Sequence, residues 1–86
     1  MARYRLSIKR SAARELEAVA RKGDRQRLVA RIEPLASNPR PSAYEKLAGH
    51  THAYRVRQVE NRVLYTVDDV ERSVVVFKIG HRREVR

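Results

Sequence analysis

Residues 53–79, AYRVRQVENRVLYTVDDVERSVVVFKI, decide the fold of this chain. Apolar and polar side chains alternate in three runs, at 53–58, 62–67 and 73–79, as they do in strands that bury one face. Only short, turn-like segments separate the runs. Such connections favour antiparallel pairing, because parallel strands need a crossover of roughly a dozen residues. The second half of the chain therefore predicts a small antiparallel sheet.

The first half predicts one more strand and two helices. Residues 3–8 alternate like a strand, and from residue 11 to residue 22 the apolar positions change to a helical period. Ser11 is placed to cap this helix and Gly23 to end it. A second helix is expected from about Asp24.

Prolines end the helical half. Pro34 predicts a kink or an early stop in the second helix, because proline lacks an N–H donor, and residues 37–41 form a loop with two further prolines. The order is thus β-α-α-β-β-β, an α+β fold with two helices on one face of a small, mainly antiparallel sheet. The other face is left to solvent or ligand. With 86 residues, we expect a single domain, 1–86.

The composition favours a polyanionic partner. The net charge is +10 and the sequence pI is about 11.1, which suits RNA, DNA or an acidic protein segment. Cysteine is absent, which excludes disulfides and thiolate chemistry. His50 and His52 have only Glu45 as a nearby carboxylate, so we expect no metal site and no cofactor. Without a signal peptide or an apolar span, the expected location is the cytoplasm, with no membrane contact.

Cationic residues follow the predicted strands closely. Arg55 and Arg57 share one face, roughly 7 Å apart, and Arg62 opens the next strand just across a tight turn. His81 and Arg82 follow Gly80, which is expected to turn the chain sharply out of the last strand. RNA cleavage needs a base, an acid and cations for the charge that gathers on the phosphorus. Because histidine exchanges protons near neutral pH, His81 is the best proton carrier of the set.

Other polar and aromatic residues have simpler interpretations. Tyr54 and Tyr65 alternate with valines, so we expect them in the core. Asp68 and Asp69 lie in a hairpin turn, where aspartate is favoured for backbone reasons, and are not expected to be catalytic.

Five blocks in this order resemble the RelE family of the RelE/ParE toxin superfamily. They are KLAG at 46–49, AYRVR at 53–57, NRVLY at 61–65, VVV at 74–76 and GHRREV at 80–85. The resemblance implies a RelE-like fold and the toxin of a type II toxin–antitoxin pair. Such a toxin is an endoribonuclease that enters the ribosomal A site and cleaves messenger RNA by attack of a 2′-hydroxyl on the adjacent phosphate.

The resemblance also implies partners and residue roles. The partners are a cognate antitoxin, the ribosome with its mRNA, and operator DNA through the toxin–antitoxin complex. The catalytic set implied by the residues and the resemblance together is Arg57, Arg62, His81 and Arg82, and the expected RNA contacts are Lys46, Arg55, Arg83 and Arg86.

Two departures from the family pattern leave alternatives open. Arg57 stands where some members have a lysine suited to act as the base, and arginine rarely gives up its proton. Arg86 follows Val85 where the family usually has a tyrosine that stacks on a base, which implies attenuated activity. The alternatives are a ParE-like toxin that binds DNA gyrase without cleaving RNA, and a non-catalytic module that binds operator DNA with its antitoxin.

Overall fold

Five strands, two helices and one short 3₁₀ helix form the part of the chain that the computed structural model describes, residues 3–81 and residue 83. In chain order the elements are β1 (Arg5–Ile8), α1 (Arg10–Glu17), α2 (Lys22–Ile32), the 3₁₀ helix η1 (Glu33–Ala36), β2 (Glu45–Lys46), β3 (Ala53–Gln58), β4 (Asn61–Asp68) and β5 (Ser73–His81). Apart from β2, this is the predicted order.

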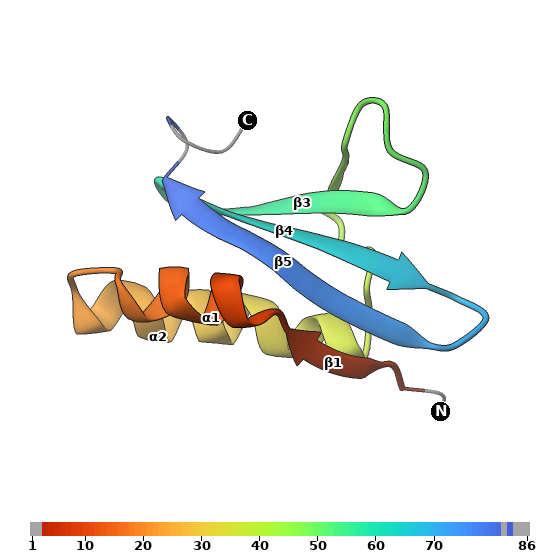
Figure 1. Ribbon diagram of the computed structural model, residues 1–86, viewed down its shortest axis with the longest axis horizontal. Helices are drawn as coiled ribbons and strands as arrows, with labels where there is room; N and C mark the ends of the chain where they lie inside the picture. The colour runs from red at the N-terminus through yellow and green to blue at the C-terminus, as the bar shows by residue number, and fades with distance from the viewer. Residues whose placement is uncertain (1–2, 82, 84–86) are drawn as a thin grey trace.

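All the strands belong to one mixed sheet. Its strand order is β1-β5-β4-β3-β2, in which β1 runs parallel to β5 and the other neighbours are antiparallel. Figure 1 shows both helices on the same side of this sheet, and no helix of the described residues lies on the opposite face. The predicted α+β fold, with helices on one face, is therefore confirmed.

The helix boundaries correct two details of the prediction. Lys9, not Ser11, is the N-cap of α1, and no side chain caps that end. Gly23 lies in the first turn of α2, where it does not end α1. The connection is closed by Arg25, whose guanidinium donates hydrogen bonds to the carbonyl oxygens of Val19 and Ala20. A side chain of α2 therefore bonds to the backbone carbonyl oxygens that follow α1, where Gly23 had been expected to end the helix.

The expected break near Pro34 is confirmed. Helix α2 ends at Ile32, and η1 begins at Glu33 with Pro34 in its first turn. Proline is tolerated there because the first N–H groups of a helix have no partner within it. Neither helix in the described part of the chain is long and apolar enough to cross a membrane.

The core lies between the helices and the sheet. Tyr54 and Tyr65 are buried in it, as predicted. The other fully buried side chains come from the helical segment and from alternate positions of β3, β4 and β5; the largest are Leu28, Ile32, Leu35, Val56, Val63, Val67, Val74, Val76 and Ile79. This one-sided burial leaves the intervening strand residues on the open face.

Strand β5 departs from the prediction at its end. Gly80 and His81 continue the strand and pair with Arg62 and Asn61, so Gly80 does not turn the chain out of the sheet. The long β4 partner supplies backbone hydrogen bonds up to this point. A sharp turn does occur between β3 and β4. Val59 there has a positive φ of 55°, a conformation that two-residue hairpins require.

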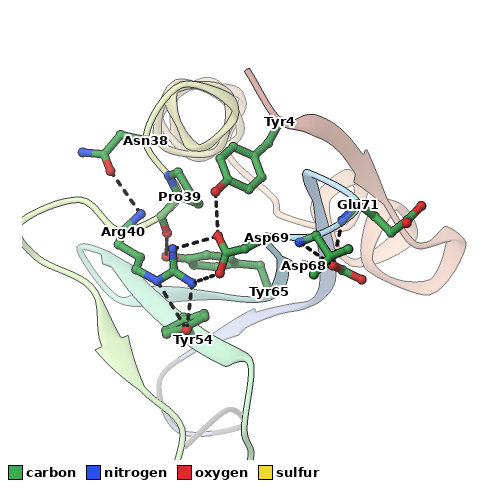
Figure 2. A network of polar contacts seen from close by, with 10 residues as sticks. Tyr4, Asn38, Pro39, Arg40, Tyr54, Tyr65, Asp68, Asp69 and Glu71 are labelled. Atoms are coloured by element: carbon green, nitrogen blue, oxygen red, sulfur yellow. Dashed lines mark hydrogen bonds and ion pairs between the residues drawn. The ribbon is translucent and has the colours of Figure 1, made fainter. Parts of the chain in front are cut away.

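A polar network holds together the end of the sheet at which β1 begins (Figure 2). The Arg40 guanidinium donates to both carboxylate oxygens of Asp69, at 3.2 and 2.7 Å, and to the Tyr54 hydroxyl. The Tyr4 hydroxyl donates to the same carboxylate at 2.6 Å. Asp69 therefore links the residue before β1, the loop at Arg40 and the β4–β5 turn. Turn propensity alone did not predict these links. Asp68 has the predicted turn role and accepts hydrogen bonds from two backbone N–H groups.

The Asp69 network predicts a pH-dependent contribution to stability. Hydrogen bonds from Arg40 and then Tyr4 lower the pKa of Asp69 from 3.8 to about 2. A depressed pKa stabilises the folded state above the unfolded value, and this stabilisation is lost as the pH falls through the folded value. We expect Asp69→Asn to lower the thermal midpoint at pH 7, by a margin that shrinks as the pH falls from 3.8 to about 2.

The measurement is thermal unfolding across this pH range. Asp68→Asn is the matched control, because an amide oxygen still accepts the backbone hydrogen bonds that Asp68 receives. Equal thermal midpoints for wild type and Asp69→Asn at pH 7 would show that the charge of Asp69 contributes nothing to the stability of the fold.

Candidate nucleic-acid interface

Three arginines gather on the open face of the sheet, at the end formed by the β3–β4 turn. Arg57 is directly paired with Arg62 across the two strands, and Arg55 lies two positions along β3 on the same face. Directly opposite residues of a pair share a face and lie within about 5.5 Å of each other at Cβ. We call Arg55, Arg57 and Arg62 the arginine cluster. The expected convergence of these three residues is confirmed by the strand register.

One carboxylate joins two members of the cluster. Glu45, from β2, accepts hydrogen bonds through Oε1 from Nε of Arg55 and ion-pairs with Nε of Arg57, both at 3.2 Å. The side chain of Arg57 is 58% exposed and that of Glu45 is 40% exposed, whereas Arg55 is only 16% exposed. Arg55 and Arg57 share the single negative charge of Glu45. These three side chains together therefore keep a net positive charge beside Arg62.

His81 does not join the arginine cluster. It is paired with Asn61, and Asn61 and Arg62 are neighbours on one strand, so their side chains point to opposite faces. His81 lines a hollow of about 490 Å³ on the helix side, together with Glu15, and its Nε2 lies 3.6 Å from Glu60 Oε2. Continuation of β5 through Gly80 fixes this orientation. The expected grouping of His81 with the arginines is therefore wrong.

The remaining predicted residues fall into two groups. Arg82 and Arg86 lie outside the described residues, so their predicted roles stay predictions. Arg83 is exposed, and its backbone N–H donates to Nδ1 of His81. Lys46 is exposed and lies near Arg55, at the rim of a second hollow.

This open-face hollow has a volume of about 380 Å³. Arg55 of β3, Leu64 of β4 and Phe77 of β5 contribute from the sheet. The remaining lining comes from β2 and the loop after it, namely Lys46, Leu47, Ala48 and His50. The site thus combines an apolar floor with basic side chains, and it adjoins the arginine cluster through Arg55.

Several of these residues were not predicted as site residues. Glu45 was not recognised because β2 has only two residues, too few for an alternating pattern. Phe77 was assigned only to an apolar strand, and its face depends on a register shift that the alternation does not show. His50 was considered as a possible metal ligand and was not among the predicted site residues. No group of three or more possible metal ligands occurs within residues 3–81 and 83.

The fold of the chain is shared with a known class of small toxins. The family model of the ParE toxin of type II toxin–antitoxin systems, parDE, matches residues 6–86. The chain therefore belongs to the ParE toxin family, within the RelE/ParE superfamily that the sequence resembles. No curated protein matches the chain.

Solved structures with a similar fold include RelE toxins. The RelE–RelB complex from Pyrococcus horikoshii is 25% identical with a TM-score of 0.81, and the match covers 95% of this chain and 97% of that one. The isolated Escherichia coli RelE toxin is 25% identical with a TM-score of 0.79, over 91% and 83%. The RelB–RelE complex from Methanococcus jannaschii is 17% identical with a TM-score of 0.74, over 91% and 92%, and shows the fold alone.

Proposed function

We propose that this toxin is an endoribonuclease that cleaves messenger RNA on the ribosome. The observation that carries the proposal is the direct pairing of Arg57 with Arg62 on the face of the sheet opposite the helices. Two adjacent guanidinium groups match the oxygens of a phosphate. The likeness to RelE toxins at 25% identity supports this choice within the superfamily.

The proposed reaction is an attack of the 2′-hydroxyl on the adjacent phosphorus. A new O2′–P bond forms and the P–O5′ bond breaks, leaving a 2′,3′-cyclic phosphate and a 5′-hydroxyl. Negative charge builds up on the phosphate oxygens in the transition state, and fixed cations there stabilise it more than the ground state. Arg57 and Arg62 have this role, and water protonates the leaving 5′-oxygen.

The proton of the 2′-hydroxyl needs an acceptor on the same face. Glu45 meets this condition, because its carboxylate contacts Arg55 and Arg57. His81 does not, since the register places it on the helix side. We assign Glu45 as the general base, positioned on this face by the arginines that bind it. The site requires no metal or cofactor for this step.

The partners follow from the charge and from the family. A chain with a net charge of +10 suits an acidic or amphipathic antitoxin that covers the basic face. The similar structure from Pyrococcus horikoshii is a complex of RelE with RelB, which supports a cognate antitoxin for this chain. Ribosomes place the proposed activity in the cytoplasm, and operator DNA is the proposed partner of the toxin–antitoxin complex.

A second function has one observation in its favour. The family model that matches residues 6–86 is that of ParE toxins. In this alternative the toxin binds DNA gyrase and leaves RNA intact. The arginine cluster would then serve as a protein-binding surface.

Primer extension on mRNA bound to purified ribosomes distinguishes the two functions. We expect wild-type protein to produce cuts at A-site codons and to leave gyrase supercoiling unchanged. The same mRNA without ribosomes is the control for a contaminating nuclease. Absence of codon-position cuts, combined with inhibited supercoiling, would reject the ribonuclease in favour of the gyrase toxin.

A further inference from the structure

Phe77 is an aromatic residue on the open face. It is the chain's single phenylalanine, and the four tyrosines all pack on the helix side: Tyr54 and Tyr65 lie in the core, and Tyr4 and Tyr44 pack against it. Phe77 is outside this core cluster, half-buried, and lines the open-face hollow. Its ring is therefore available to a ligand that lies on the basic face.

A β-bulge places Phe77 there. Tyr65 pairs with Val76, but the preceding residue of β4, Leu64, pairs with Lys78, so Phe77 is the extra residue of the bulge. Bulges re-aim side chains and are frequent beside functional sites. Lys78 turns to the helix side, where its Nζ contacts Glu15 at 2.5 Å. The ring of Phe77 lies instead beside Leu64 and Arg55.

The loop after β2 forms the wall of the hollow. Gly49 adopts a φ of +78°, a left-handed conformation that ordinary residues rarely take, and so lets the loop fold back over the sheet. This brings His50 and the apolar Leu47 to the edge of the hollow. The resulting hollow brings the aromatic Phe77 and the basic Arg55 together.

This chemistry matches one nucleotide of single-stranded RNA. Every nucleobase has a flat apolar face that stacks on an aromatic ring, and the attached phosphate needs a nearby cation. Arg55 supplies positive charge at the rim, and Lys46 also lines the hollow. The Glu45 carboxylate offsets part of the charge of Arg55. Because the same carboxylate also contacts Arg57, whose side chain is more than half exposed, the two arginines together keep a positive charge beside the hollow.

We propose that the open-face hollow binds one unpaired nucleobase, stacked on Phe77, next to the phosphate held by the arginine cluster. The inference rests on the proposed function and adds a base-binding subsite to it. The strength of stacking depends on the ring area of the nucleobase and not on its hydrogen-bonding groups. The subsite is therefore expected to prefer purines over pyrimidines without selecting one sequence.

Fluorescence of 2-aminopurine tests this subsite directly. The probe is a short single-stranded RNA with one 2-aminopurine, bound to the full chain at low salt, with total binding followed by anisotropy. Wild type is expected to quench the fluorophore on binding. Phe77→Leu keeps an apolar floor but removes the ring, so quenching is expected to disappear and affinity to fall about tenfold, the effect of one lost stacking contact. Phe77→Trp restores a ring and is expected to restore quenching.

Two results would overturn the subsite. One is wild-type binding by anisotropy without quenching, as expected if the hollow instead receives a segment of a protein partner. The other is equal quenching by wild type and Phe77→Leu. Cleavage on ribosomes is measured separately, so quenching without ribosomal cuts would reject the ribonuclease and leave the base subsite standing.

Discussion

Arg62→Ala is expected to reduce ribosome-dependent mRNA cleavage by about 10²- to 10³-fold, the usual effect of removing one electrostatic donor from a transition state. Arg62 faces Arg57 across the β3–β4 pair, so its loss leaves one guanidinium on the phosphate. Arg62→Lys keeps the charge but not the planar pair of donors, and is expected to recover activity only in part. The measurement is the single-turnover cleavage rate on programmed ribosomes.

Stability and general charge loss need separate controls for this variant. Arg62 is partly buried, so thermal unfolding must show that Arg62→Ala remains folded under the assay conditions. Arg14→Ala removes an equal charge from the exposed surface of α1 and is expected to cleave like wild type. Equal losses in Arg62→Ala and Arg14→Ala would mean that net charge, and not the cluster, determines activity.

Glu45→Gln is expected to separate binding from catalysis. Loss of the general base should reduce the cleavage rate by about 10²- to 10⁴-fold. RNA affinity should rise at the same time, because the carboxylate no longer competes with phosphate for Arg55 and Arg57. Cleavage rate and RNA affinity are measured on the same ribosome preparation, at several salt concentrations.

A different outcome would assign Glu45 another role. If the carboxylate only neutralises the arginines, Glu45→Gln should raise both affinity and cleavage, which contradicts its assignment as the base. Glu71→Gln is the matched control, since Glu71 is exposed in the β4–β5 turn, away from the arginine cluster. It should leave the cleavage rate unchanged.

Much of the fold could be predicted because its signals are local. The β3 boundaries match the alternating pattern, and Pro34 ends α2 because the missing N–H acts at that position. The end of α1 could not be predicted, since it depends on Arg25 bonding to the backbone of the preceding connection. The link from Asp69 to Arg40 likewise joins segments 29 residues apart in sequence.

The candidate site was predictable only where strand alternation determines it. Arg55 and Arg57 share a face because they are two residues apart, and a tight turn brings Arg62 beside them. His81 was assigned to the wrong face because Gly80 was expected to end β5, whereas pairing with β4 continues it. The face on which Phe77 lies depends on a one-residue register shift between β4 and β5. Such a shift moves a side chain to the other face without any change in composition.

Direct observation of RNA on the arginine cluster is the most decisive measurement. A structure of this protein on a ribosome should be determined with an mRNA whose A-site nucleotide lacks the 2′-hydroxyl, so that it binds uncleaved. We expect the phosphate after that nucleotide within hydrogen-bond distance of the Arg57 and Arg62 guanidinium groups. An mRNA lying against the helices, with the open sheet face away from it, would contradict the account.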